Sequence, residues 1–258
     1  MFRYTPISIV FVVLLLASIL QVQYEGGPWW IIAIPVLLFL IVISIGSFKI
    51  SLNFYLKSLI KSKTDEKIIA ITFDDGPNLE VTPQLLDLLK SEEIPATFFC
   101  IGKQIEKYPE VVKTIDQKGH LIGNHSYSHH RWFSFFSSKK MESEIIMNNE
   151  LIHRTTGKYP ALFRPPYGVT NPNLKQALSA VNMYSIGWSL RSFDTVKNKD
   201  FVIRKLIRKT KPGDVVLFHD NDVKIIEIVS VYLKWLKENG FKVVSLDQLF
   251  NIEGYDAK

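Results

Sequence analysis

The sequence predicts an α/β protein with a parallel sheet, curled into an incomplete (β/α) barrel or left open, preceded by a two-helix membrane hairpin. Two observations support this fold class. Short apolar runs alternate with amphipathic stretches from residue 66 to residue 250, as in chains of β/α units. Residues 4–24 and 26–48 contain no charged side chain, and each run is long enough to cross a hydrocarbon layer.

The first 50 residues are predicted to form two transmembrane helices. Gly26-Gly27-Pro28 supplies a tight turn between them, and Trp29-Trp30 suits a water–lipid boundary. A cleaved signal peptide is the alternative, but the apolar run is long for a signal core and a second span follows at once. Basic residues flank the hairpin on both outer sides, which favours a cytoplasmic location for both ends.

Residues 51–65 are predicted to be a basic juxtamembrane linker. Leu52, Tyr55, Leu56 and Leu59 fall on one helical stripe, which suggests an amphipathic helix on the membrane surface, and a plain tether is the alternative. The soluble domain then spans residues 66–250, and residues 251–258 form a C-terminal tail. About seven parallel strands are expected in the domain, at residues 68–72, 96–101, 121–124, 162–164, 184–188, 215–218 and 242–245.

Composition excludes some classes of function. The net charge of +6 is dispersed among acidic residues, so a nucleic-acid-binding surface is not expected. The single cysteine, Cys100, rules out an internal disulfide and a thiolate metal cluster, and its apolar neighbours predict a small buried side chain.

Two adjacent carboxylates close the first strand of the domain, in the stretch Thr72-Phe73-Asp74-Asp75-Gly76-Pro77. The carboxyl ends of parallel strands are where α/β proteins build active sites. Taken alone, Asp-Gly-Pro is also ordinary turn chemistry. Neighbouring side chains at a strand end diverge in direction, so Asp74 and Asp75 can serve different roles.

Two histidines follow the third strand, in His125-Ser126-Tyr127-Ser128-His129. A spacing of four residues places both imidazoles on one side of a helical turn, where they can bind one metal ion. With Asp75 they would form a two-histidine, one-carboxylate site with open positions for water and substrate. His130 is expected to point away from this face.

Further polar residues follow the later strands. Arg164-Pro165-Pro166-Tyr167 ends the fourth, and the two prolines would hold the guanidinium and the amide of Tyr167 in fixed directions. The fifth strand leads from Trp188 through Arg191 to the acid Asp194. The sixth ends in Leu217-Phe218-His219.

Together, and in this order, these stretches resemble the five motifs of the polysaccharide deacetylase family, which has the NodB homology domain and is similar to carbohydrate esterase family 4. The resemblance implies a deformed (β/α) barrel that hydrolyses N-acetyl groups of amino sugars with one divalent metal, commonly Zn²⁺, with Co²⁺, Ni²⁺ or Mn²⁺ as alternatives. It implies Asp75, His125 and His129 as metal ligands, Asp74 as general base and His219 as general acid.

The resemblance also implies supporting roles. The amide of Tyr167 would donate to the oxyanion, while Arg164 and Asp194 would orient Asp74 and His219. The substrate would contact Tyr167, Pro166, Leu217, Trp188 and Arg191. Thr195 stands where many relatives carry tryptophan, so the apolar wall of the pocket is expected to differ and Arg191 would reach an anionic substrate.

The expected function is removal of N-acyl groups, foremost N-acetyl, from amino sugars of a glycan such as peptidoglycan. An alternative is a deformylase or deacetylase of an amino sugar linked to undecaprenyl phosphate at the membrane face. A catalytically inactive sugar-binding module is the non-enzymatic alternative, and the presence of both Asp74 and His219 argues against it. A wall substrate predicts an extracytoplasmic domain, whereas the basic residues predict a cytoplasmic one.

Overall fold

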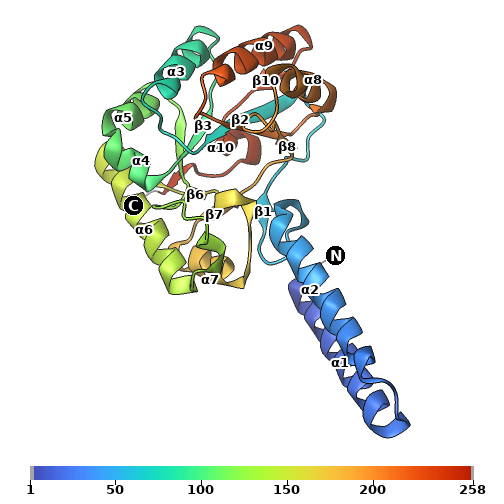
Figure 1. The fold of residues 1–258 in the computed structure, drawn as a ribbon. Coiled ribbons are helices and arrows are strands. Elements are labelled where there is room, and N and C mark those ends of the chain that lie inside the picture. Colours follow the sequence, from blue (N-terminus) through green and yellow to red (C-terminus); the bar gives the residue numbers. More distant parts are fainter. Residues whose placement is uncertain (1–2, 257–258) are drawn as a thin grey trace.

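The computed structural model describes residues 3–256, and a long helical hairpin projects from one side of an α/β domain (Figure 1). The hairpin consists of α1 (Tyr4–Glu25), the 3-10 turn η1 (Trp29–Ile32) and α2 (Ala33–Phe48). Both spans are long and apolar enough to cross a membrane by length and composition, and only 6% and 11% of them is buried. The helices therefore pack against each other and not inside the core of the domain.

The domain is built on a nine-stranded sheet in which every strand pairing is parallel. Its main path runs in the order β1-β7-β6-β4-β3-β2-β9-β8, and β10 pairs with β2 off that path. The strands are β1 (Ser58–Leu59), β2 (Ile68–Asp74), β3 (Thr97–Cys100), β4 (Leu121–Asn124), β6 (Leu162–Phe163), β7 (Tyr184–Ile186), β8 (Leu190–Arg191), β9 (Val215–His219) and β10 (Lys242–Val243).

The connection between β7 and β8 shows that the sheet curls. These strands lie near opposite ends of the strand order, yet only residues 187–189 join them. Residues that follow β1 fill the gap between the two ends. The amide of Gly187 donates to the carbonyl of Leu59 (2.8 Å), and the amide of Ser62 donates to the carbonyl of Gly213 (2.8 Å). The predicted incomplete barrel of parallel strands is confirmed.

Helices cover the outer face of the curled sheet (Figure 1). They are α3 (Val81–Ser91), α4 (Gly102–Lys107), α5 (Pro109–Gln117), α6 (Ser138–Thr156), α7 (Pro172–Val181), α8 (Lys199–Lys209) and α9 (Lys224–Glu238). The short helix α10 (Leu246–Phe250) instead packs Leu246 and Leu249 against the inner face of the sheet, and the 3-10 turns are η2 (Ile50–Leu52), η3 (Phe133–Phe135) and η4 (Pro166–Gly168). Sequence signals define several ends: the side chain of Asn171 accepts from the amide of Leu174 at the start of α7, and Gly157 (φ 74°) ends α6.

The core sits between the central strands and the helices. Every residue of β3, and all but the first of β2, is buried, as expected for parallel strands covered on both faces. Phe73 stacks on Phe98 and Phe218 from the two neighbouring strands, with ring centroids 5.1 Å and 5.7 Å apart. Cys100 is fully buried in this layer, as predicted. This packing fixes the carboxyl ends of β2, β3 and β9, where the site lies.

The segment 51–65 differs from its prediction. The amphipathic helix predicted there does not form, because only η2 reaches into the segment and β1 then pairs with β7. Phe54 is 3% exposed, and a Cβ on Gly46 of α2 would lie 2.3 Å from its ring. The Lys61 ammonium pairs with Asp214 at 3.1 Å. Within the apolar stripe, the Tyr55 hydroxyl donates to the carbonyl of Ile43 in α2 (3.4 Å), and Leu59 packs against the buried residues inside the barrel.

The residues after 250 also have a place in the fold. Strand β11 (Tyr255–Asp256) pairs antiparallel with β5 (Tyr159–Pro160), and the amide of Ile122 donates to the Tyr255 hydroxyl at 3.0 Å. The predicted tail thus packs against the domain up to Asp256. Two-residue strands such as β5, β8 and β11 are too short to show a periodic pattern, which is why they were not predicted.

Candidate active site

A cavity of about 280 Å³ opens at the carboxyl ends of the strands. It gathers most of the residues singled out by the sequence, which lie far apart along the chain. Its lining comprises Asp74, Asp75, His125, His129, Tyr167, Gly168, Trp188, Arg191, Thr195, Leu217 and His219.

The two adjacent aspartates point to different partners because the backbone changes direction between them. Asp74 is the last residue of β2, whereas Asp75 has left the strand with φ 76°, a left-handed conformation that aspartate tolerates better than most residues. Gly76 follows, and a Cβ there would lie 2.3 Å from the carboxylate of Asp220. The turn therefore requires glycine at position 76.

Asp75, His125 and His129 have a geometry that fits a divalent metal ion. Nε2 of His125 and Nε2 of His129 each lie 3.6 Å from Oδ1 of Asp75, and the three ligand atoms fall within 4.8 Å of one another. Nδ1 of His125 lies 2.8 Å from the carbonyl of Arg164, which favours the tautomer with a free Nε2 lone pair. Two imidazoles and one carboxylate leave coordination positions for water and substrate.

Electrostatics keeps the donor set in the form that a metal needs. Burial lowers the pKa of His129 to about 4, with the neighbouring His125 acting in the same direction, so its imidazole is neutral near pH 7. Burial opposes ionisation of Asp75, but its interactions with the His125 side chain outweigh it and lower the pKa of Asp75 to about 2. The carboxylate is therefore ionised. Metal binding requires both states.

The two histidines are brought together by an irregular loop, which corrects the prediction of a helical turn. Residues 125–130 form no helix, and Ser126 (φ 61°) and His129 (φ 44°) adopt left-handed conformations. The imidazole centroids lie 4.8 Å apart. His130 instead stacks on Phe136 at 5.5 Å, away from the metal site as expected.

Helix α6 holds this loop in place through residues that were not predicted. Asn148 is fully buried, and its side-chain Nδ2 donates to the carbonyl of Cys100 at 2.9 Å and to the carbonyl of Ser126 at 3.0 Å. Glu144 accepts from the amide and the hydroxyl of Ser128, both at 2.8 Å. No local signal identifies Asn148 or Glu144, because their partners lie in other segments of the chain.

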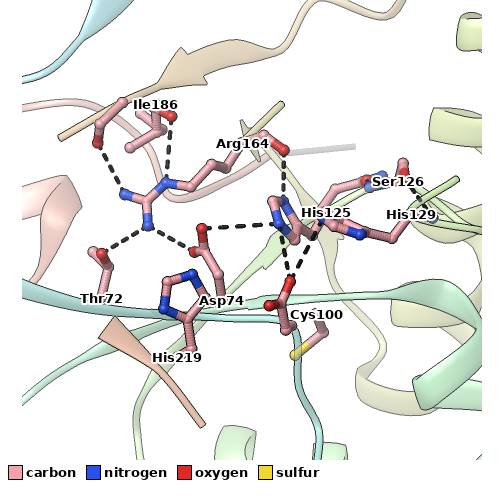
Figure 2. Close-up of polar contacts among 12 residues, drawn as sticks. Thr72, Asp74, Cys100, His125, Ser126, His129, Arg164, Ile186 and His219 are labelled. Carbon is pink, nitrogen blue, oxygen red and sulfur yellow. Dashed lines mark hydrogen bonds and ion pairs between the residues drawn. The ribbon is translucent and has the colours of Figure 1, made fainter. Parts of the chain in front are cut away.

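Arg164 is the largest fully buried side chain, and it binds Asp74 (Figure 2). Nη1 donates to Oδ1 of Asp74 and to the hydroxyl of Thr72, both at 2.7 Å. Nη2 donates to the carbonyl of Gly187 (2.9 Å), and the guanidinium lies 4.1 Å from the Phe99 ring centroid. The other Asp74 oxygen lies 3.8 Å from Nε2 of His125, beside the metal ligands. Arg164 thus fixes this carboxylate in the cavity.

His219 and Asp194 form the second charged pair. Nδ1 of His219 lies 3.0 Å from Oδ1 of Asp194, and the backbone amide of His219 donates to Oδ2 at 2.8 Å. Burial opposes protonation of His219, but the hydrogen bond and charge of Asp194 outweigh it and raise the pKa of the imidazole. Ser192 donates to the same carboxylate at 2.6 Å. The ring is therefore held so that Nε2 is available as a proton donor.

The predicted substrate-contact residues separate into two groups. Tyr167, Leu217, Trp188 and Arg191 line the cavity, whereas Pro166 is buried and does not line it. The Tyr167 backbone is left-handed (φ 59°), and its ring packs on His129 at 4.7 Å. Trp188 packs on Gly168, where a Cβ would lie 2.4 Å from the indole.

A buried acid beneath the site was not predicted to matter. Asp220 follows His219 and is 1% exposed, and the hydroxyl of Thr82 donates to Oδ2. Oδ1 has no hydrogen-bond partner among the described residues. Burial raises the pKa of Asp220 to about 7, although the Thr82 hydrogen bond acts in the opposite direction. Asp220 was overlooked because its packing against Gly76 depends on the pairing of β2 with β9.

The fold and the site together define a class of protein: a hydrolase of the curled parallel barrel type, with a candidate metal triad, a carboxylate held by arginine and an imidazole held by a carboxylate in one cavity. Residues 61–186 match the family model described as polysaccharide deacetylase. The chain is 35% identical over 190 residues to a peptidoglycan-N-acetylglucosamine deacetylase of Bacillus cereus, covering 70% of this chain and 68% of the relative.

The chain belongs to the polysaccharide deacetylase family, and it is a hydrolytic deacetylase of that family. It is also 30% identical over 191 residues to the peptidoglycan-N-acetylmuramic acid deacetylase PdaA of Bacillus subtilis, covering 72% of each chain. A crystal structure of a peptidoglycan N-acetylglucosamine deacetylase superposes with a TM-score of 0.71 at 32% identity. That match covers 76% of this chain and 94% of the other.

A second structural relative is a pseudoenzyme of the same family from Bacillus anthracis, with a TM-score of 0.70 at 25% identity, covering 75% of this chain and 68% of the other. Family membership alone therefore does not identify the residues that carry activity.

Proposed function

We propose that this protein removes N-acetyl groups from amino sugars of peptidoglycan while anchored in a membrane. The observation that carries the proposal is the pair Asp74–Arg164 beside the triad Asp75, His125 and His129, with His219 on the same cavity. The relatives act on N-acetylglucosamine or N-acetylmuramic acid of peptidoglycan, as their names state. The substrate assignment rests on these similarities.

Amide hydrolysis needs an attacking water, a stabilised oxyanion and a proton for the departing nitrogen. Asp74, held by Arg164 at the edge of the cavity, accepts the proton of the attacking water. The imidazolium of His219, supported by Asp194, donates a proton to the nitrogen of the leaving amino sugar. The backbone amide of Tyr167 donates a hydrogen bond to the oxyanion.

A divalent ion held by Asp75, His125 and His129 supplies Lewis acidity toward water and the amide carbonyl when it is bound. Zn²⁺ is the proposed native ion, since two imidazoles and one carboxylate form a donor set that suits it. Co²⁺, Ni²⁺ and Mn²⁺ are the alternatives to be compared in reconstitution.

The apolar hairpin is proposed to be a two-pass membrane anchor. The exposure of both spans argues against helices of a soluble core, and their pairing through Phe11 and Phe39, stacked at 4.1 Å, favours a hairpin over a cleaved signal peptide. The lysines after α2 are a weaker guide to sidedness than the sequence suggested, because Lys61 is paired with Asp214 in the domain. Protease protection in sealed spheroplasts assigns the face.

The decisive experiment measures acetate released from purified peptidoglycan by the full-length protein in detergent, before and after chelation and with each metal restored. We expect activity that requires metal. Asp74→Asn should retain metal and lose hydrolysis, whereas His125→Ala should lose both. Full activity of Asp74→Asn would refute the assignment of the base. A metal-loaded protein that binds glycan but releases no acetate would instead establish the sugar-binding alternative.

A further inference from the structure

A second, larger cleft lies beside the catalytic cavity, at the end of the domain that meets the hairpin. Its volume is about 630 Å³, and it is bounded by residues that follow α2, by the extension of β1, by residues 188–191 and by α8 with the loop after it. Trp188 and Arg191 line both the cleft and the catalytic cavity. The two spaces are therefore adjacent.

The cleft is strongly cationic. Six basic side chains and a single acid, Asp214, line it; the basic ones are Lys49, Lys61, Arg191, Lys205, Lys209 and Lys211. Asp214 already pairs with Lys61 at 3.1 Å and accepts from the Ser189 hydroxyl at 2.8 Å. Among residues 3–256, no carboxylate lies in ion-pair contact with the other five cations.

These cations are held close together by the fold. Lys205 donates to the carbonyl of Arg191 at 2.6 Å, and its ammonium sits 3.7 Å from the Phe193 ring centroid. The Arg191 guanidinium lies 5.1 Å from the same ring. Burial lowers the pKa of Lys205, and the charges of Arg191 and Lys209 lower it further. A bound anion would reduce the repulsion between these neighbouring positive charges.

The position of the cleft indicates where its anion comes from. Its lining begins at Phe48, the last residue of α2, and continues through Lys49 and Ile50. The carbonyl of Ser47 in α2 accepts from the amide of Thr170 at 3.0 Å, which ties the end of the helix to the loop after η4. With α2 in a bilayer, the cleft would open at the height of lipid headgroups, where basic residues attract anionic lipids.

We propose that this cleft is a binding site for the phosphate group of an anionic membrane lipid. The inference rests on the membrane location proposed above, but not on the catalytic assignment. The cations supply charge-assisted hydrogen bonds to phosphate oxygens, and Phe48, Ile50 and Ile60 provide an apolar wall for the adjoining part of the lipid. Because the cleft adjoins the catalytic cavity, a sugar carried on such a phosphate would lie within reach of it.

The test uses full-length protein in uncharged detergent micelles, titrated calorimetrically with short-chain phosphatidylglycerol. Phosphatidylcholine of the same chain length and inorganic phosphate serve as comparison ligands. The variant is Lys209→Gln with Lys211→Gln, two exposed positions whose change leaves the core intact. The matched control is Lys234→Gln with Lys237→Gln, which removes two exposed lysines from α9.

We expect phosphatidylglycerol to bind more tightly than phosphatidylcholine, with the cleft variant weakening it about fivefold per lysine and the control leaving it unchanged. Equal binding by wild type and cleft variant would overturn the site. Inorganic phosphate that binds as tightly as the lipid would overturn the lipid assignment.

A further arm uses polyprenyl-phosphate-linked N-acetylglucosamine: tighter binding than phosphatidylglycerol would identify the carried sugar as the source of the phosphate, and equal binding would identify membrane lipid in general. Acetate release and carbonate extraction from membranes, measured separately, report on the proposed function itself.

Discussion

Replacing Arg164 with methionine tests how the carboxylate of Asp74, the proposed general base, is held. The substitution keeps an unbranched side chain but removes the bonds to Thr72, Asp74 and Gly187 and leaves Asp74, 4% exposed, without its partner. Removing one member of a buried ion pair costs about 3–5 kcal/mol. For a domain of this size, that corresponds to a melting temperature lowered by roughly 6–20 °C.

A double-mutant cycle tests whether the loss of stability comes from the unpaired charge of Asp74. If the cost in Arg164→Met comes from an unpaired carboxylate, then adding Asp74→Asn should restore part of the stability, and the two changes should be non-additive by about 2 kcal/mol. Thermal unfolding of the full-length protein in detergent measures each variant. Arg154→Met, at an exposed arginine of α6, is the control and should change stability by less than about 0.5 kcal/mol. Additive effects of the Arg164 and Asp74 changes would refute the reasoning.

Four further outcomes are expected. In Asp194→Asn, loss of the partner that raises the pKa of His219 should move the alkaline limb of the pH–activity profile to lower pH, since the general acid must be protonated; an unmoved limb would exclude His219 as that acid. Asn148→Ala should weaken metal binding by about 10- to 100-fold in a chelator competition, because the loop of the two histidines loses its support, and unchanged affinity would contradict this. The folded-state pKa of Asp220 is raised to about 7, so its stabilising contribution is present below its ordinary pKa and is lost as pH rises through about 7. Asp220→Asn should therefore gain stability relative to wild type between about pH 4 and 7, by at most about 4 kcal/mol, and melting temperatures with parallel pH dependences would count against it. A chain that starts at residue 64 lacks β1 and should melt lower than one that starts at residue 50, and equal melting temperatures would show that β1 contributes nothing.

Much of the site was predictable because its residues follow strands with a clear apolar signal. Asp74 and His219 each end a buried run, and parallel pairing of β2 with β9 places them opposite each other in register. The close approach of His125 and His129 was also expected, but from a helical turn that does not exist. Left-handed residues in a loop achieve the same approach, and a spacing of four residues does not distinguish the two.

The features that were missed depend on tertiary contacts. Asn148 and Asp220 have no local signal, since their partners lie many residues away in the chain. Segment 51–65 has a helical apolar pattern, yet its backbone hydrogen bonds go to β7 and to the loop before β9. Pairing with the open edge of the curled sheet satisfies the backbone hydrogen bonds of this segment, and it stabilises the segment more than a short isolated helix would.

The seam formed by residues 58–62 has a consequence for how the enzyme would search for substrate. This segment is hydrogen-bonded into the barrel and is not a free tether. The opening of the catalytic cavity therefore cannot move away from the hairpin. With the hairpin in a bilayer, the opening keeps one height and one tilt, and the molecule samples glycan only by lateral diffusion. The cavity would then reach only a thin layer of glycan parallel to the membrane. Glycan strands farther from the membrane surface would not be deacetylated.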